Sequence, residues 1–252
     1  MATPKQPILI IYTGGTIGMR EDPMTKTLSP MKFELIQEEI PELYKLGFDI
    51  ESVTFNPPID SANMTPDIWV QLAKTIKTNY SKYDGFVILH GTDTMAYTAS
   101  ALSYMLENLD KPVIMTGSQL PIGVLRTDGK ENIITAVQIA AAKKEGKAIV
   151  PEVCIYFSSH LFRGNRTTKQ DSQQFSAFTS HHYPSLAIAG VDIRYDYEKI
   201  NYPRSKGILS INTSVDDNVI IIKIFPGLSQ KYFEAILALS GLRGIILESY
   251  GS

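Results

Sequence analysis

Four short polar segments, each in the stretch that follows a strand candidate, carry side chains that could do chemistry. They are Thr13-Gly14-Gly15-Thr16, Asp60-Ser61, Gly91-Thr92-Asp93 and Gly117-Ser118-Gln119. A turn or a helix cap explains each segment alone. Four together favour a small polar ligand. Asp60 and Ser61 could hold the amino and carboxylate groups of a zwitterion, or they could serve only as turn residues.

A threonine hydroxyl becomes a useful nucleophile only when a base activates it. Lys169, within residues 163–169, is a candidate for that base, and Asp93 could orient its ammonium group. A lysine is a base only in its neutral form. A basic turn at the surface is the alternative interpretation of this segment. His90 is more typical of a partly buried histidine with satisfied hydrogen bonds than of a base.

The elements that must position these groups alternate along the first part of the chain. Continuous apolar runs predict strands, and segments with apolar residues at the helical period predict helices. Strands are expected at residues 7–12, 48–55, 85–90, 112–116 and 152–157, and helices beginning at Thr65-Pro66 and spanning 95–106 and 129–144. This order predicts an α/β fold with a parallel sheet. Ligands bind such sheets at the carboxyl ends of the strands, where the four polar segments lie.

The pattern weakens after residue 157 and then resumes. Residues 190–206 have few aliphatic side chains and are interpreted as a linker. A strand at 219–225, a helix at 231–239 and a strand at 244–247 then begin a second, smaller α/β unit. We therefore expect an N-terminal domain at 1–189, a linker at 190–206 and part of a C-terminal domain at 207–252.

The composition excludes several classes of function. The 24 basic and 26 acidic residues give a formal net charge of −2, so neither a nucleic acid nor an anionic membrane surface is an expected partner. Cys154 is the single cysteine, which excludes an intrachain disulfide and favours a buried thiol. No pair of histidines has the spacing of a metal site, and no apolar run is long enough to span a membrane. A cytoplasmic protein without a metal is expected.

Four longer stretches resemble the bacterial-type L-asparaginases, and their cytoplasmic type I branch in particular. These stretches are residues 12–19, 90–95, 116–119 and 162–169. The sequence TGGTI followed by HGTDTM is highly specific, and the resemblance continues from about residue 7 to the last residue.

The resemblance implies hydrolysis of L-asparagine to L-aspartate and ammonia through an acyl-enzyme, with no cofactor. In that family Thr16 matches the nucleophile, and Thr92, Asp93 and Lys169 match a second catalytic cluster. Asp60 and Ser61 match the loop that grips the substrate's α-amino and α-carboxylate groups, and Asp93 also holds the amino group. The family fold is a large N-terminal and a smaller C-terminal α/β domain, assembled as a homodimer and often as a tetramer.

Three departures from the family pattern have consequences. Residues 20–30 lack the tyrosine that supports the nucleophile in many relatives, and Leu28 lies nearest its place. Glu248 stands where some cooperative members carry an arginine of a regulatory asparagine site. Relatives continue past the position of Ser252, so we expect the 252-residue chain to be weakly active or inactive, with a disturbed dimer interface.

Three alternatives stay open at this point. One is an enzyme of broader specificity that hydrolyses both glutamine and asparagine. Another is a relative that binds an amino acid without catalysis. The third is a nucleotide-binding α/β module, although the GxGxxG pattern of dinucleotide sites is absent.

Overall fold

The computed structural model describes residues 7–21, 24, 28–30, 33–203 and 207–251. The chain divides into two compact units, Met1–Thr213 and Ser214–Ser252. This boundary lies later than the predicted end of the first domain at residue 189. The reason is that part of the predicted linker, β15 (Ile193–Tyr195), joins the main sheet, while β16 (Ser210–Ile211) pairs with β6 (Leu106–Glu107).

The first unit is built on a sheet of eight strands, and five of them are parallel neighbours. In sheet order these five are β4 (Asp49–Thr54), β1 (Pro7–Tyr12), β5 (Gly85–Leu89), β7 (Val113–Thr116) and β10 (Val153–Phe157). The chain passes from β1 to β4 on one side and then returns to β5 on the other. The strand order therefore reverses between β1 and β5, which is where sheets of this kind bind ligands. The predicted parallel α/β fold is confirmed.

Three antiparallel strands extend the sheet beyond β10. They are β11 (His160–Arg163), β14 (Ala187–Ala189) and β15. A tight turn at Ser158 and Ser159, both with positive φ, folds β11 back along β10. The sequence did not predict these strands, because they are three or four residues long in a polar region and carry no sustained apolar period.

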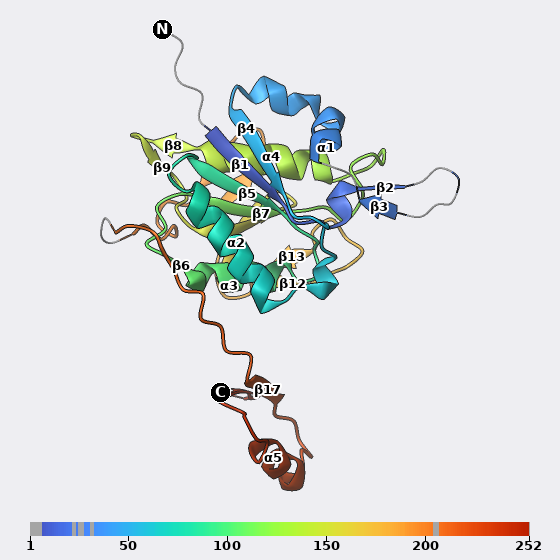
Figure 1. Cartoon of the computed structure of the whole chain (residues 1–252), viewed down its shortest axis with the longest axis vertical. Helices are drawn as coiled ribbons and strands as arrows, with labels where there is room; N and C mark the ends of the chain where they lie inside the picture. The colour runs from blue at the N-terminus through green and yellow to red at the C-terminus, as the bar shows by residue number, and fades with distance from the viewer. Residues whose placement is uncertain (1–6, 22–23, 25–27, 31–32, 204–206, 252) are drawn as a thin grey trace. The chain divides into compact units, whose positions relative to one another are not determined.

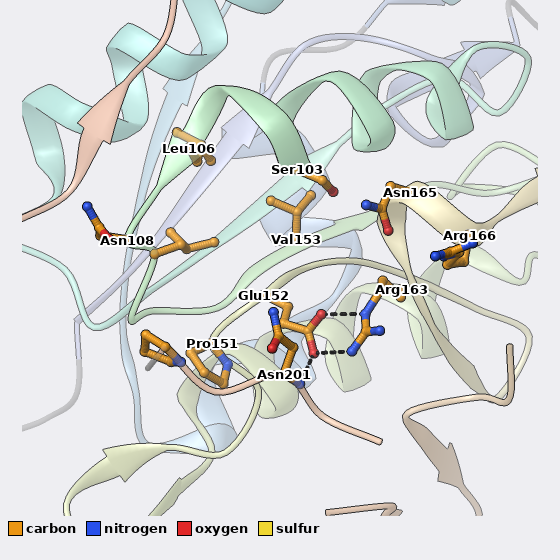
Figure 2. Close-up of a pocket in the computed structure, with 12 residues that line it drawn as sticks. Ser103, Leu106, Asn108, Pro151, Glu152, Val153, Arg163, Asn165, Arg166 and Asn201 are labelled. Carbon is orange, nitrogen blue, oxygen red and sulfur yellow. Dashed lines mark hydrogen bonds and ion pairs between the residues drawn. The ribbon is translucent and has the colours of Figure 1, made fainter. Parts of the chain in front are cut away.

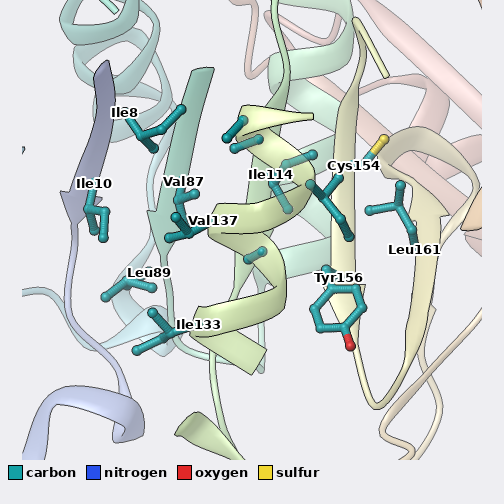
Figure 3. Close-up of a cluster of buried hydrophobic side chains, with 14 of the residues drawn as sticks. Ile8, Ile10, Val87, Leu89, Ile114, Ile133, Val137, Cys154, Tyr156 and Leu161 are labelled. Atoms are coloured by element: carbon teal, nitrogen blue, oxygen red, sulfur yellow. The ribbon is translucent and has the colours of Figure 1, made fainter. Parts of the chain in front are cut away.

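Helices cover both faces of the sheet (Figure 1). On one face, α4 (Gly129–Ala141) and α1 (Phe33–Glu39) pack on the strands, and Figure 3 shows Ile133 and Val137 of α4 against Val87 and Ile114. On the other face lie α2 (Pro66–Asn79) and α3 (Met95–Met105). Because both faces are covered, β1, β5, β7 and β10 read as apolar runs, whereas the edge strand β4 mixes polar and apolar residues. Cys154 is a fully buried free thiol, as predicted.

Shorter elements complete the first unit. The hairpins are β2 (Met19–Glu21) with β3 (Leu28–Pro30), β8 (Lys143–Lys144) with β9 (Lys147–Ala148), and β12 (Thr168–Lys169) with β13 (Phe178–Thr179). The single-turn helices are η1 (Thr16–Gly18), η2 (Pro41–Leu46), η3 (Ser61–Asn63) and η4 (Gly164–Arg166).

The second unit consists of two parallel strands and one helix. These are β17 (Val219–Lys223), α5 (Gln230–Leu237) and β18 (Gly244–Glu248). Apolar side chains of both strands, Ile221 and Ile246 among them, are more than half exposed. Glu248 forms an exposed ion pair with Lys223, with 2.8 Å between Oε1 and Nζ.

Candidate functional site

Two loops meet at the point where the strand order reverses. The loop after β1 is tied to the end of β5, because the amide and the hydroxyl of Thr13 both donate to the Leu89 carbonyl, at 3.0 and 2.9 Å. Gly15 then lies directly against Gly91. A Cβ on Gly15 would come within 2.4 Å of the Gly91 nitrogen. Only glycine permits this approach, and Gly15 also has a φ of +91°.

Thr16 and Thr92 each follow one of these two touching glycines. Consecutive Cα atoms are about 3.8 Å apart, so both threonines lie at the same edge of the sheet. Thr16 is half-buried and begins η1. The Thr13 hydroxyl, by contrast, is buried and bonded to Leu89, so it fastens the loop. The loop at residues 20–30 lacks the family tyrosine, and its residues 22–23 and 25–27 lie outside the described residues.

The loop after β4 joins the same junction. The Ile59 amide donates to the Thr13 carbonyl at 2.6 Å, and the Thr94 hydroxyl donates to the Ser61 carbonyl at 2.7 Å. Ser61 is buried, and a Cβ on Gly91 would lie only 2.4 Å from its Oγ. Its hydroxyl therefore packs against the backbone that leads into Thr92.

Asp60 is exposed and caps the turn that follows it. Its Oδ1 accepts a hydrogen bond from the Ala62 amide at 3.0 Å. The structure thus gives Asp60 the turn role that the sequence left open, and it places the carboxylate one residue from Ser61.

Lys169 reaches Thr92 and Asp93 from a distant part of the chain. Its Nζ donates to the Thr92 hydroxyl at 2.8 Å and to Asp93 Oδ1 at 2.7 Å. The lysine side chain is 16 % exposed, whereas that of Asp93 is 64 % exposed. The ammonium group is therefore shielded, and its carboxylate partner faces solvent. A hydroxyl, an amine and a carboxylate form one connected cluster.

Two packing contacts hold Lys169 in this place. In the hairpin, Lys169 is paired with Phe178, whose ring packs edge-on against Phe157 at 5.0 Å between centroids. One turn earlier, Gly164 lies against α3, and a Cβ there would be 3.1 Å from the Ala99 carbonyl oxygen. The segment can pass this close to α3 because Gly164 lacks a side chain.

Gln119 completes the cluster; the sequence placed it in one of the four polar segments but gave it no role of its own. The Thr92 hydroxyl donates to Gln119 Oε1 at 3.2 Å, while Gln119 Nε2 donates to the Gln174 carbonyl at 3.1 Å. The second bond fixes the amide so that its oxygen faces Thr92. The Thr92 hydroxyl therefore accepts from Lys169 and donates to Gln119. The position of Gln119 after β7 was the available signal, but its partner Gln174 lies 55 residues further along the chain.

Asp128 holds the Gln119 loop from the start of α4. Its carboxylate accepts the amides of Gln119 and Leu120 and the side-chain amide of Asn132, at 3.0 to 3.2 Å. One carboxylate thus fixes the backbone that presents Gln119.

A separate cavity of about 410 Å³ lies at the amino end of β10 (Figure 2). Along its wall, the Arg163 guanidinium donates two hydrogen bonds to the Glu152 carboxylate, at 2.6 and 3.0 Å. The Asn201 amide donates to the same carboxylate at 2.5 Å. These groups satisfy one another, so they join β10, β11 and the segment around Asn201.

The comparisons with known proteins agree with this geometry. Residues 7–201 match the family model described as asparaginase, N-terminal. The chain belongs to the asparaginase family. It is 41 % identical to L-asparaginase 1 of Escherichia coli K12 over 98 % of the chain and 71 % of that protein. It is 38 % identical to the 60 kDa lysophospholipase of Mus musculus over 99 % of the chain.

A solved structure of an asparaginase has the same fold. L-asparaginase I from Vibrio cholerae superposes with a TM-score of 0.86 at 38 % identity, over 98 % of this chain and 73 % of that one. The chain spans 47 % of the mouse relative's length. The resemblance stated from the four sequence stretches is thus confirmed at the level of the family.

Two features are absent from the described residues. No helix among them is long and apolar enough to cross a bilayer. In the same part of the chain, no three His, Cys, Asp or Glu side chains gather where a metal ion could bind.

Proposed function

We propose that this asparaginase-family chain hydrolyses L-asparagine to L-aspartate and ammonia through a threonine acyl-enzyme. The observation that carries the proposal is the cluster of Lys169, Thr92 and Asp93, with Nζ 2.8 Å from Oγ1 and 2.7 Å from Oδ1, beside the loop that bears Thr16. The naming of the Escherichia coli relative supports the same reaction.

In the proposed reaction Thr16 Oγ1 attacks the side-chain amide carbon of asparagine. The proton given up by Thr16 passes to the amide nitrogen, the carbon–nitrogen bond breaks, ammonia leaves, and an aspartyl ester remains on Thr16. Water then attacks the ester, releases aspartate and restores the hydroxyl. In this step Lys169 acts in its neutral form: the Thr92 hydroxyl turns from Gln119 Oε1 toward Nζ, gives its proton to Lys169 and activates the attacking hydroxyl or water.

The recognition of substrate follows from charge. Asp60 and Asp93 are exposed carboxylates and suit the α-ammonium group of the amino acid. The Ser61 hydroxyl, which packs against Gly91, suits the α-carboxylate. Gln119 Oε1 accepts hydrogen bonds only, so it favours the NH₂ of a carboxamide over the oxygen of a carboxylate.

The experiment that tests this proposal measures ammonia release from L-asparagine and L-glutamine, and fatty-acid release from a lysophospholipid. Release of ammonia from asparagine with much less from glutamine supports the proposal, and equal rates support the broader enzyme. Binding of aspartate without any turnover would replace the enzyme by an amino-acid binding protein. Hydrolysis of the lysophospholipid alone would contradict the proposal.

We also propose a homodimer in the cytoplasm. The free buried thiol of Cys154 suits a reducing compartment. Native mass spectrometry and cell fractionation test the two statements. A monomer at micromolar concentration contradicts the first, and recovery outside the cytoplasmic fraction contradicts the second.

A further inference from the structure

His90 belongs to a chain of hydrogen bonds that ends at the catalytic loop. The indole nitrogen of Trp69 donates to the Thr98 hydroxyl at 3.0 Å, and that hydroxyl lies 3.0 Å from His90 Nε2. The other ring nitrogen, Nδ1, lies 2.7 Å from the Gly91 carbonyl. His90 is 1 % exposed and Thr98 is fully buried. Residues of α2, α3 and the loop directly after β5 are thereby joined in one line.

The carbonyl end of this chain, together with the neutrality of the ring, fixes the direction of the bonds. A carbonyl oxygen can only accept, so His90 Nδ1 must carry a hydrogen and donate it to Gly91. Burial keeps the ring neutral, so Nε2 carries no hydrogen and accepts from the Thr98 hydroxyl, whose oxygen in turn accepts from the Trp69 indole. His90 is therefore the neutral tautomer with its proton on Nδ1.

The group that this tautomer holds is the centre of the site. Gly91 lies against Gly15 of the first loop and against Ser61 of the second, and its carbonyl belongs to the peptide that leads into Thr92. Rotation of that peptide would carry the Thr92 hydroxyl away from Lys169, to which it is bonded at 2.8 Å.

We propose that His90 is a positioning residue for the reaction. Its Nδ1–H holds the Gly91–Thr92 peptide, and the Thr98 hydroxyl, which is bonded to Trp69, donates to its Nε2 and so supports this tautomer. The expected effect of His90 on catalysis rests on the proposed function. His90 does not touch the reacting atoms, and it takes up and gives back no proton.

The electrostatic setting agrees with this role. Burial lowers the pKa of His90 to about 4, because a charged imidazole would lose its contacts with water. The ring thus stays neutral at the pH at which the enzyme would work.

Two substitutions separate the two halves of the ring. In His90→Asn the side-chain amide nitrogen stands near the place of Nδ1 and keeps the bond to Gly91. In His90→Gln the amide stands near the place of Nε2, keeps the bond to Thr98 and loses the bond to Gly91. Glutamine is the closer match to histidine in volume, so a role in packing alone predicts that His90→Gln is the milder change.

The proposal predicts the reverse order for asparagine hydrolysis. Misplacement of a reacting group by about 1 Å commonly lowers the rate about a hundredfold. We expect kcat to fall about tenfold to a hundredfold in His90→Gln and less than about threefold in His90→Asn, with little change of KM in either. Equal losses in the two variants, or a larger loss in His90→Asn, overturn the proposal.

A measurement without turnover keeps the test independent of the proposed function. Nitrogen-15 NMR of the histidine-labelled full chain should show a protonated Nδ1 and an unprotonated Nε2 for His90 at neutral pH. The amide resonance of Thr92 should move further in His90→Gln than in His90→Asn. A proton on Nε2, or equal movement of the Thr92 resonance, refutes the positioning role.

The two failures are distinguishable. If the unchanged chain releases no ammonia, the proposed function fails, and the NMR results alone then decide whether His90 holds the Gly91–Thr92 peptide. If ammonia is released but the tautomer is the other one, the inference fails and the proposed function stands.

Discussion

Acid should destabilise the first unit through His90. Burial lowers the pKa of this side chain from 6.5 to about 4 in the folded protein, and the unfolded chain keeps the ordinary value. Below pH 6.5 the unfolded state therefore binds a proton more readily than the folded state does. The stabilisation is complete above pH 6.5 and is lost as the pH falls toward 4.

The size of the effect follows from the two pKa values of His90. The interval from 6.5 to about 4 corresponds to about 3 kcal/mol, at about 1.4 kcal/mol for each pKa unit. Most of this loss, roughly 2 kcal/mol, should occur between pH 7 and pH 4.5. A loss of this size is a large part of the stability of an ordinary domain.

The assay is urea unfolding followed by tryptophan fluorescence. Trp69 is the single tryptophan of the chain, and it is bonded to Thr98 beside His90, so its emission reports on this region. The measurement is made at pH 7 and pH 4.5 on the unchanged chain and on His90→Asn, which has no titrating group at this position. Subtracting the pH-dependent loss of unfolding free energy in His90→Asn from that in the unchanged chain removes the contribution of the carboxylates. If both proteins lose the same free energy of unfolding, His90 is not a buried neutral histidine and the reasoning is refuted.

Two other substitutions test how the site and its support are built. Gly15→Ala would place a Cβ 2.4 Å from the Gly91 nitrogen at a φ of +91°, so asparagine hydrolysis should be lost and the melting temperature lowered. The matched control is Gly47→Ala, because Gly47 has a φ of +76° and open space around it. This control should lower the free energy of unfolding by only about 1 kcal/mol and leave activity intact. Arg163→Met would leave the Glu152 carboxylate, 9 % exposed, without its guanidinium partner, and urea unfolding should show a loss of about 2–3 kcal/mol; an unchanged midpoint would mean that the ion pair contributes nothing.

The parallel sheet could be predicted because its strands are buried on both faces. Four of the five parallel strands read as continuous apolar runs, with glycine, proline or a polar turn at their ends, whereas the edge strand β4 mixes polar and apolar residues. The helices α2 and α4 could be predicted for a related reason, since their apolar residues recur at the helical period. The predicted bounds of these strands and helices lie within a few residues of the observed ones, because glycine, proline and polar turn residues end the elements in the structure as well.

The antiparallel extension could not be predicted from local patterns. Residues 193–195 were assigned to a linker because this three-residue strand lies among charged side chains and carries no apolar pattern of strand length, although its partner strand, residues 187–189, lies just before it in the chain. The same limit applies to the site. Local turns indicated Thr92 and Asp93, but the approach of Lys169 depends on β11, η4 and β12 folding back over α3, and the residues alone left its role undecided.

The network around Thr92 shows a further limit. Gln119 and His90 were both visible after their strands, yet their functions depend on Gln174 and Thr98, whose contacts arise only in the folded chain. His90 was interpreted as a histidine with satisfied hydrogen bonds, and the structure confirms this. The role proposed for His90 follows from its partners, Thr98 and the Gly91 carbonyl, which only the folded chain identifies.

The most direct test of the central claim compares kcat for asparagine hydrolysis in Thr16→Ala, Thr92→Val and Lys169→Met with kcat for the unchanged chain. Loss of one member of such a catalytic unit commonly costs about a thousandfold or more. The matched control is Thr75→Ala, because the Thr75 hydroxyl is bonded only to the Gln71 carbonyl on the exposed side of α2. The account predicts a loss of about a thousandfold or more in each of the three variants and a normal rate in the control. A near-normal rate in any of the three would remove that residue from the catalytic set, and normal rates in all three would contradict the proposed reaction at this site.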